Sequence, residues 1–381
     1  MAGRDFLRRM PEASRELRRP RSVWQKLHID LPLLILLLML TAYGLLVLYS
    51  ASGQEVHYIK RQGIFFLLAY GVMFTVAQIQ LHVFQRWAPW FYLAGVGLLL
   101  LVMFFGIGAK GAQRWLNLGG FRFQPSEVLK LAVPILLASY LSSRILPPRF
   151  THVFITLVLI TVPTLLIMDQ PDLGTSILIA TSGIIVLFMA GLRWRYILGA
   201  FSLLLAGAWP MWHFVLRDYQ RQRVLTMFNP EADKLGAGWN IIQSKTAIGS
   251  GGVSGKGWLQ GTQSQLDFLP ESHTDFIIAV LAEEFGLMGV LLLMGLYLLV
   301  IARGLMIALY AQDTFGKLLA SAITITFFVY VFVNIGMVTG LLPVVGVPLP
   351  LVSLGGTSIV TLMAGFGILM AIGTERRRVT R

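Results

Sequence analysis

The sequence contains no cysteine among its 381 residues. This absence excludes disulfide bonds, thiolate metal ligands and cysteine nucleophiles. Charged residues are also scarce, at 13% of the chain against about 25% in ordinary soluble domains. Hydrophobic residues make up 56%, and the mean hydropathy is +0.72. So little charge is too little for a water-facing surface, and the chain is predicted to be an integral membrane protein.

The positive charge of the chain is concentrated near its two ends. The formal net charge is +13 at pH 7, and much of it lies in residues 1–30 and 374–381. Basic tails beside membrane spans set topology and contact anionic lipid headgroups. We therefore interpret both tails as cytoplasmic and expect no nucleic-acid partner. The arginine-rich start runs into an apolar segment long enough to stay in the membrane, so no cleavable signal peptide is expected.

Long apolar segments recur along the whole chain. A membrane-spanning helix needs about 20 mostly apolar residues. The sequence therefore predicts an all-α integral membrane protein, with about ten transmembrane helices in a single polytopic domain over residues 1–381. The predicted spans are 31–50, 63–81, 88–107, 125–143, 152–168, 174–191, 195–215, 276–303, 316–341 and 356–373.

Lysine and arginine in the connections predict which way the helices run. With both termini in the cytoplasm, the inner connections and tails hold most of these residues, as the positive-inside rule requires. The polar loops 108–124, 169–173 and 216–275 then face outside. The last of these joins helices seven and eight and is far longer than an ordinary connection, which favours a functional or partly helical loop.

A glycine-rich stretch in this loop, AIGSGGVSGKGWLQGTQ, invites comparison with a phosphate-binding P-loop. The spacing fails, because the position five before Gly255 is Ser250 and Lys256 is followed by Gly257 rather than Ser or Thr. We interpret the stretch as a flexible or closely packed lid.

Polar side chains gather at the predicted outer ends of four helices. In GAQRWLNLGGFRFQPSEVLK, Pro125 suits the first position of a helix, and Glu127 and Lys130 follow on one face. Asp172 directly precedes the sixth span, and Asp275 lies in LPESHTDFIIAVLAEEFG before the eighth. Three arginines follow the seventh span: Arg217, Arg221 and Arg223.

Each of these groups also has a purely structural interpretation. Glu127 and Asp172 suit helix starts, and Asp275 suits a capping turn with Ser272. Lys130 can extend its amine to the headgroups, and the arginines can bind lipid phosphate. Ionisable groups at the mouths of spans are nevertheless rare and tend to face protein or water-filled cavities. Acids and bases from several helices on one membrane side therefore indicate a cavity for an anionic lipid headgroup, lined by Glu127, Lys130, Asp172, Arg223 and Asp275.

Several long motifs in order give the chain a specific resemblance. They run from LHIDLPLLILLLML and VLYSASG through GAQRWLNLGGFRFQPSEVLK and DQPDLGTS. They continue through NIIQSKTAIGSGGVSGKGWLQGTQSQLDFLPESHTDFIIAVLAEEFG to GVPLPLVSLGGTS. Over nearly its whole length the chain resembles the SEDS family of bacterial membrane proteins (shape, elongation, division and sporulation). The short N-terminal tail and compact length resemble the elongation branch more than the division branch.

The resemblance implies a ten-span fold similar to the membrane part of GT-C glycosyltransferases. It implies peptidoglycan polymerisation from lipid II at the outer face of the inner membrane, during cell elongation. The implied partners are a class B penicillin-binding protein, which is a transpeptidase, and other elongasome proteins. The essential aspartate of the family falls on Asp275 in HTDF, and its cavity residues fall on Glu127, Lys130 and Asp172. Its tryptophan falls on Trp115.

Glycan polymerisation then suggests a role for each group. A sugar hydroxyl is a poor nucleophile, so a general base helps, and we assign this role to Asp275. Developing charge on the leaving pyrophosphate needs cations, for which Lys130 and Arg223 are the first candidates. Arg114 and Arg221 are the second candidates for this role. The three acidic residues Asp275, Asp172 and Glu127 also suggest a Mg²⁺ or Mn²⁺ site completed by substrate phosphate.

Two other classes of function fit parts of the sequence. A flippase for the same lipid-linked precursor would share the spans and the anionic-headgroup cavity. The proline-rich stretch 340–358 suits a re-entrant break of the kind found in transporters, but it could equally line a lipid path in an enzyme. Polar groups on one face favour an enzyme. A non-catalytic scaffold would not need Glu127, Lys130, Asp172 and Asp275 together.

Overall fold

The structure is a computed structural model. It describes residues 27–109, 112–118, 121–216, 218–233, 236–265 and 271–375. Most of the two predicted cytoplasmic tails, 1–30 and 374–381, therefore lies outside the described residues.

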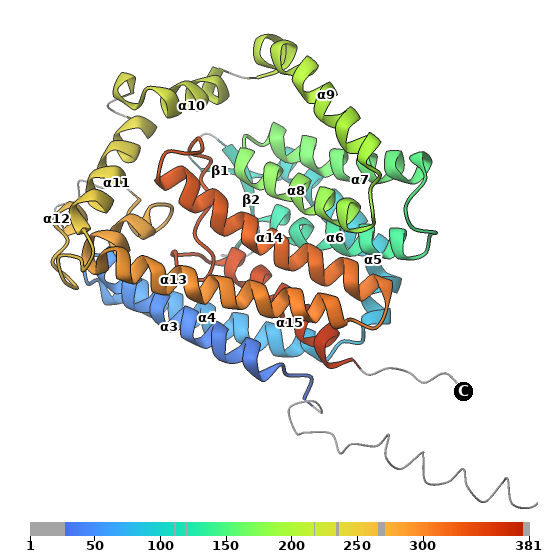
Figure 1. The fold of residues 1–381 in the computed structure, drawn as a ribbon, viewed down its shortest axis with the longest axis horizontal. Helices are drawn as coiled ribbons and strands as arrows, with labels where there is room; N and C mark the ends of the chain where they lie inside the picture. Colours follow the sequence, from blue (N-terminus) through green and yellow to red (C-terminus); the bar gives the residue numbers. More distant parts are fainter. Residues whose placement is uncertain are drawn as a thin grey trace, which may run out of the picture.

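Ten helices of the described chain follow the ten predicted spans (Figure 1). Eight are long and apolar enough to cross a membrane, and α8 is an apolar helix of 17 residues. The protein is thus an all-α multi-pass membrane protein. The helices are α3 (Leu31–Ala51), α4 (Val56–Ala77), α5 (Leu81–Phe105), α6 (Pro125–Ser142), α7 (Phe150–Asp169), α8 (Leu173–Met189), α9 (Trp194–Pro210), α13 (Ile277–Tyr310), α14 (Thr314–Val338) and α15 (Thr357–Thr374).

Several helix ends differ from the predicted spans. α4 begins at Val56, several residues before the predicted start, because Lys60 and Arg61 lower the local hydropathy without preventing a helix. α13 continues to Tyr310, and α9 is extended by the π-helix η1 (Met211–Val215). Hydropathy marks the apolar centre of a span, whereas the helix continues into the polar region at each end.

The long loop 216–275 is partly helical, as predicted. It contains α10 (Asp218–Phe228), the 3₁₀ turn η2 (Pro230–Ala232), α11 (Ala237–Gly251) and α12 (Thr262–Gln265). In Figure 1 these elements and α9 form an arch beside the bundle that returns to the start of α13.

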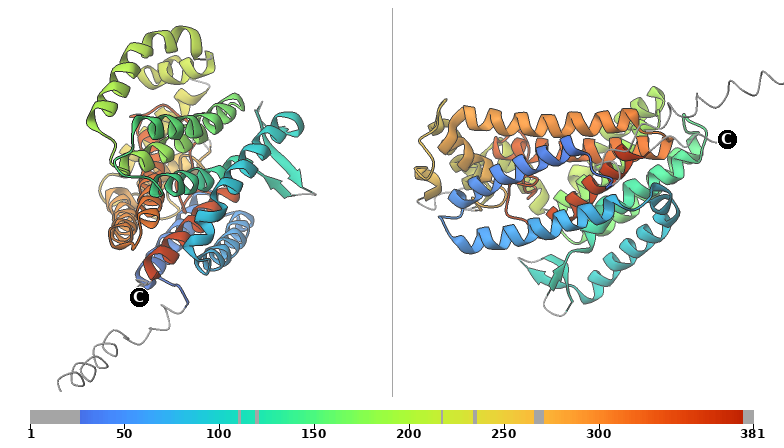
Figure 2. Two further views of the ribbon diagram at one scale, coloured as in Figure 1. Left: turned by 90° about the vertical axis from the view of Figure 1, so that its right-hand side faces the viewer. Right: turned by 90° about the horizontal axis from the view of Figure 1, so that it is seen from below.

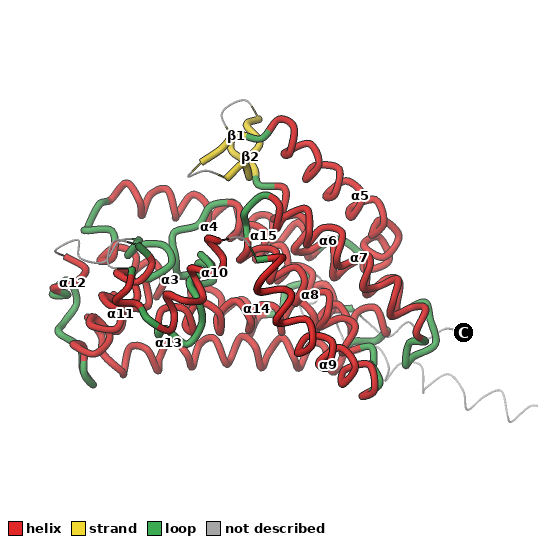
Figure 3. Tube along the Cα trace, turned by 90° about the horizontal axis from the view of Figure 1, so that it is seen from above, coloured by secondary structure: helices red, strands yellow, loops and turns green. Residues whose placement is uncertain are grey.

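A small sheet between α5 and α6 was not predicted. Its strands β1 (Ile107–Ala109), β2 (Ala112–Leu118) and β3 (Phe121–Phe123) are antiparallel in the order β1-β2-β3. The sheet projects from the bundle (Figures 2 and 3). Its middle strand carries Arg114 and Trp115 to the edge of the cavity described below.

The glycine-rich stretch docks against a break in α13. Gly286 has φ +63° there, which interrupts the helix. The main-chain N–H groups of Lys256 and Gly257 donate to the carbonyls of Glu283 and Glu284, both at 3.0 Å. A break frees helical carbonyls that need new donors. The closely packed alternative for this stretch is therefore correct.

The contacts at the two ends of α3 show on which membrane face the turn with Asp275 lies. His28 contacts Thr374 at 3.1 Å, so the start of α3 lies beside the end of α15. At the other end of α3, the carbonyl of Ala51 accepts a hydrogen bond from Ser272, three residues before Asp275. A helix of 21 residues is about 30 Å long, the thickness of the hydrocarbon core. The HTDF turn therefore lies on the membrane face opposite the described chain ends.

Candidate active site

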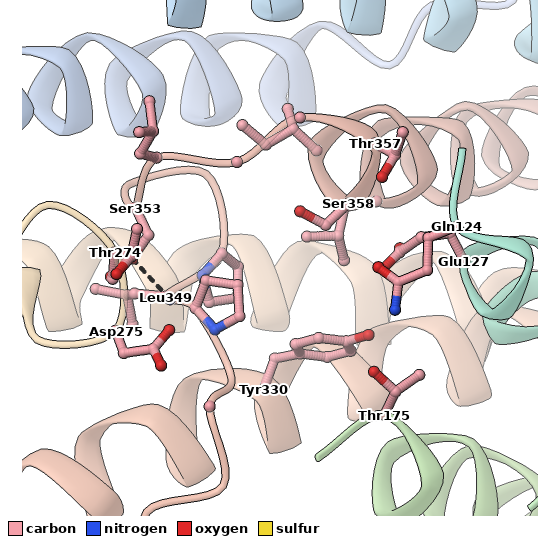
Figure 4. Close-up of a pocket in the computed structure, with 18 of the residues that line it drawn as sticks. Gln124, Glu127, Thr175, Thr274, Asp275, Tyr330, Leu349, Ser353, Thr357 and Ser358 are labelled. Atoms are coloured by element: carbon pink, nitrogen blue, oxygen red, sulfur yellow. Dashed lines mark hydrogen bonds between the residues drawn. The ribbon is translucent and has the colours of Figure 1, made fainter. Parts of the chain in front are cut away.

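A cavity of about 430 Å³ opens among β2, α6, α8, α14 and the segments that precede α13 and α15. It brings together six residues predicted for the site: Arg114, Trp115, Glu127, Lys130, Asp172 and Asp275. In Figure 4 Asp275 lies toward one end and Glu127 toward the other, with Tyr330 between them.

Glu127 and Lys130 form a buried ion pair in the first turns of α6. Lys130 Nζ lies 2.6 Å from Glu127 Oε1 and 5.4 Å from the centre of the Tyr330 ring. The Lys130 side chain is only 13% exposed, so it does not extend to the headgroups. Oε2 of Glu127 is buried and has no hydrogen-bond partner among the described residues. A ligand in the cavity can therefore supply a donor or a cation to this oxygen.

Asp172 joins three elements at the start of α8. Its Oδ1 accepts from the N–H of Thr175 at 3.3 Å, so the predicted helix cap is present. Its Oδ2 accepts from Gln124 Nε2 at 3.0 Å, and Arg114 Nη1 lies 3.9 Å away. Arg114 Nε also donates to the carbonyl of Gln170 at 3.3 Å, which fixes the arginine over this end of the cavity.

Asp275 lies in the turn immediately before α13. The N-cap residue of α13 is Phe276, which provides no side-chain cap, and the Ser272 hydroxyl donates to the carbonyl of Ala51. The carboxylate faces Gly346, where a Cβ atom would lie 3.5 Å from Asp275 Oδ2. Gly346 has φ +73°, a conformation that glycine adopts without strain.

The segment between α14 and α15 forms one wall of the cavity. It is non-helical over residues 340–356, which agrees with the predicted re-entrant break. Non-helical backbone is tolerated at membrane depth only where protein or a cavity satisfies it. Gln62 Nε2 donates to the carbonyl of Ser353 at 3.1 Å, and Tyr297 Oη donates to that of Pro350 at 2.7 Å.

The two arginines of α10 differ in the groups that they contact. Arg223 is not part of the cavity lining, but its charge interacts with Asp172 and Asp275. Burial, and then the nearby Arg114, lower the pKa of the Arg223 guanidinium from its ordinary value. Arg221 is not part of the lining either, and its guanidinium donates to the carbonyl of His213 at 2.8 Å and pairs with Asp218 at 3.7 Å. Arg217 lies outside the described residues.

The charges of the lining differ from the predicted phosphate-neutralising site. Two cationic side chains, Arg114 and Lys130, face four carboxylates. The carboxylates belong to Glu127, Asp172, Glu271 and Asp275. Both cations already lie beside a carboxylate, so the lining alone leaves little positive charge for a pyrophosphate. Within the described residues, no three acidic or histidine side chains form a metal-binding cluster.

Several lining residues were missed in the sequence. Tyr330 and Thr175 lie within apolar spans, where their polar atoms look like ordinary helix content. Gln124, Thr274 and Ser353 lie within quoted motifs, but only their contacts reveal a function. The proline-rich stretch 340–358 was the available signal for the wall, since it could line a lipid path in an enzyme as well as form a break.

Comparison with known proteins identifies relatives over almost the full chain. Residues 31–378 match the FtsW/RodA/SpoVE family, described as cell cycle proteins. The chain is 54% identical to the peptidoglycan glycosyltransferase MrdB of Escherichia coli K12, covering 95% of this chain and 98% of the relative. It is 39% identical to a probable peptidoglycan glycosyltransferase FtsW of Geobacter sulfurreducens, covering 91% and 95%.

Two solved structures share the fold. A chain from a structure on the coordination of polymerization and crosslinking by a peptidoglycan synthase complex superposes with a TM-score of 0.80 at 32% identity. The rod shape determining protein RodA of Thermus thermophilus superposes with a TM-score of 0.70 at 28% identity. Each match covers 92% of this chain and 98% of the other.

Proposed function

Because this chain belongs to the FtsW/RodA/SpoVE family, the SEDS family, and is a peptidoglycan glycosyltransferase, we propose that it polymerises lipid II with Asp275 as general base. The observation that carries this proposal is that Asp275 shares one cavity with Lys130, Arg114 and Glu127. A carboxylate that can accept a proton and cations that can stabilise a leaving group thus meet at one membrane face.

The reaction forms a bond between the C4 hydroxyl oxygen of one sugar and the anomeric carbon of another. The bond from that carbon to the lipid pyrophosphate breaks. Asp275 accepts the hydroxyl proton as the new bond forms, and such general-base help contributes roughly 10²–10⁴-fold. Asp275 lies beside the non-helical wall, which supports placing the acceptor hydroxyl there.

The leaving pyrophosphate belongs at the other end of the cavity. Lys130 and Arg114 line that end, and Arg223 lies close enough to interact with Asp172. These groups favour negative charge as it develops on the leaving oxygen. In this proposal Glu127 and Asp172 orient the two cations, and Trp115 contacts the sugar or lipid.

We also propose that a divalent cation accompanies the pyrophosphate. The excess of carboxylates in the lining and the unpartnered Glu127 Oε2 support this. Mg²⁺ typically takes one or two carboxylates and completes its ligands with substrate phosphate and water. Glu127, Asp172 and Asp275 are the candidate ligands, and Mg²⁺ or Mn²⁺ would neutralise charge on the leaving group.

Chelation tests the cation. With EDTA in excess, polymerisation by the purified chain with its partner should fall at least about tenfold and return with Mg²⁺ or Mn²⁺. The protein should stay folded throughout, because no described cluster needs a metal for stability. Full activity in EDTA would contradict the proposal.

The cellular setting is proposed from the relatives. The identity to MrdB, at 54%, exceeds that to FtsW, at 39%, which supports a role in elongation over the division alternative. The resemblance to a chain of a peptidoglycan synthase complex supports a class B penicillin-binding protein as partner. We place the chain in the bacterial inner membrane with both termini in the cytoplasm and the cavity at the outer face.

The test of the function is lipid II turnover. Asp275→Asn and Asp275→Ala should abolish glycan-chain formation, because the proton acceptor is lost, while the protein stays folded and partner-bound. Arg221→Gln is a control, since Arg221 does not line the cavity and its guanidinium contacts His213 and Asp218 instead. Full polymerisation by Asp275→Ala would disprove the base assignment. Movement of lipid II across vesicles without polymerisation would instead support the transporter alternative, and neither activity would support a scaffold.

A further inference from the structure

Three consecutive main-chain carbonyls of the HTDF turn are held from outside the turn. The carbonyl of His273 accepts from the N–H of Leu354 at 2.9 Å. The carbonyl of Thr274 accepts from the hydroxyl of Ser353. The carbonyl of Asp275 accepts from Asn334 Nδ2 at 2.9 Å. The main-chain position of Asp275 is therefore set by α14 and the non-helical wall, in addition to its own helix.

Asn334 links Asp275 to the wall directly. Its Nδ2 atom also donates to the carbonyl of Val347 at 2.7 Å, and Val347 follows Gly346, which faces the Asp275 carboxylate. Asn334 is fully buried in α14, at 0% exposure. One amide nitrogen thereby fixes the spacing between the base and the wall opposite it.

Ser353 makes the second link in the same way. It is 2% exposed, accepts from the N–H of Leu349 at 2.9 Å, and donates to Thr274 (Figure 4). Leu349 belongs to the wall, so the hydroxyl ties wall and turn together at a point one residue from Asp275. Two bonds from Asn334 Nδ2 and two at the Ser353 hydroxyl thus connect the turn to the wall, whereas Asn334 Oδ1 accepts no hydrogen bond within the described residues. Buried hydrogen bonds of this kind restrict the geometry that the turn can adopt.

We propose that Asn334 and Ser353 are positioning residues, which hold Asp275 at the depth needed for proton transfer. This inference rests on the proposed role of Asp275. Neither side chain is needed to touch substrate for this role. Misplacing a catalytic group by about 1 Å costs roughly 10²-fold in rate. Loss of position should lower kcat, whereas lipid II binding at the cation end should persist.

The experiment uses the full chain with its transpeptidase partner and measures kcat and KM for purified lipid II. Asn334→Leu removes the amide, and Ser353→Ala removes only the hydroxyl and is the milder change. We expect kcat to fall roughly 10²-fold in each, with KM changed by less than about threefold. If Asn334→Leu does not fold, Ser353→Ala decides the question alone.

Tyr297→Phe is the matched control. It also removes one buried donor to the wall, the bond to Pro350 at 2.7 Å, but among the described residues Tyr297 makes no hydrogen bond to the HTDF turn. We expect its kcat to stay within about threefold of the parent. An equal loss of kcat in Tyr297→Phe would assign the effect to general loosening of the wall and overturn the proposal.

Asp275→Asn in the same assay distinguishes failure of the positioning inference from failure of the base assignment. If Asp275→Asn is inactive while Asn334→Leu or Ser353→Ala keeps its kcat, only the positioning inference fails. If Asp275→Asn retains full activity, the base assignment itself fails.

Discussion

The ion pair between Glu127 and Lys130 shows how burial gives a polar residue a defined role. Both side chains are nearly enclosed, and Lys130 has Glu127 as a partner at 2.6 Å. Removing one partner of a buried pair leaves an uncompensated charge and costs about 3–5 kcal/mol, whereas an apolar or neutral replacement of both costs far less. Stability and activity can therefore be separated at this site.

Lys130→Met should lower stability by about 3 kcal/mol, because Glu127 loses its cation. It should also weaken use of the pyrophosphate-linked donor, visible as reduced kcat/KM for lipid II. The double variant Glu127→Gln, Lys130→Met should recover most of the thermal unfolding midpoint but not the activity. If Lys130→Met leaves the kinetics unchanged, Lys130 serves only to compensate Glu127.

The break in α13 explains two acids that the sequence places inside an apolar helix. Glu283 is fully buried, and its Oε1 accepts from Lys256 Nζ at 2.7 Å and Thr262 Oγ1 at 3.1 Å. Glu284 accepts from the hydroxyl of Ser50 on α3. The two glutamates thus fasten the glycine-rich turn and α3 to the helix that follows Asp275.

Glu283→Ala should release this turn. Lys256 remains 27% exposed and can return to water, so we expect a loss of about 2 kcal/mol, below the usual cost of breaking a buried pair. Hydrogen exchange in residues 252–263 should rise, since their partner is gone. Thr246→Val is the control, because the Thr246 hydroxyl donates to the carbonyl of Ile242 within α11. Unchanged exchange in Glu283→Ala would mean that the main-chain bonds to α13 suffice.

The helices were largely predictable from the sequence, but the small sheet between them and the break within α13 were not. Apolar length located the eight helices that are long and apolar enough to cross a membrane, because a spanning helix needs about 20 apolar residues. It could not find the small sheet, whose strands of 3, 7 and 3 residues lie in a polar loop. Nor could it find the break at Gly286, because one glycine in an apolar run is compatible with an unbroken helix. Such features depend on what packs against them.

The polar cluster of the site was predicted from charges at helix mouths and from the resemblance. Its internal geometry was not. Asn334 lies within an apolar span, and nothing in its neighbours along the chain points to Asp275. Arg221 and Arg223 are equivalent in sequence, yet the charge of Arg223 interacts with Asp172 and Asp275, whereas Arg221 contacts His213 and Asp218. Tertiary contacts across 59 residues, as between Asn334 and Asp275, carry no local signal.

The outer surface of the protein fits a lipid solvent. α9 has no buried residue, and three leucines on it, Leu203, Leu204 and Leu205, are 63–74% exposed. In water this surface would be an aggregation hazard, whereas in a bilayer it is the expected face. This apolar surface agrees with a bundle that crosses the membrane, with the HTDF turn and the described chain ends on opposite faces.

The orientation of the protein in the membrane can be tested by cysteine labelling. Because the chain has no cysteine, one introduced thiol reports without background. Thr246→Cys lies exposed on α11, on the cavity side, and Ser143→Cys lies exposed after α6, in a predicted inner connection. In intact cells with a permeable outer envelope, a membrane-impermeant maleimide should label Thr246→Cys and spare Ser143→Cys until the inner membrane is opened. The positive-inside rule requires this result, since basic connections stay in the cytoplasm. The reverse labelling would put the Asp275 cavity in the cytoplasm and contradict polymerisation at the outer face.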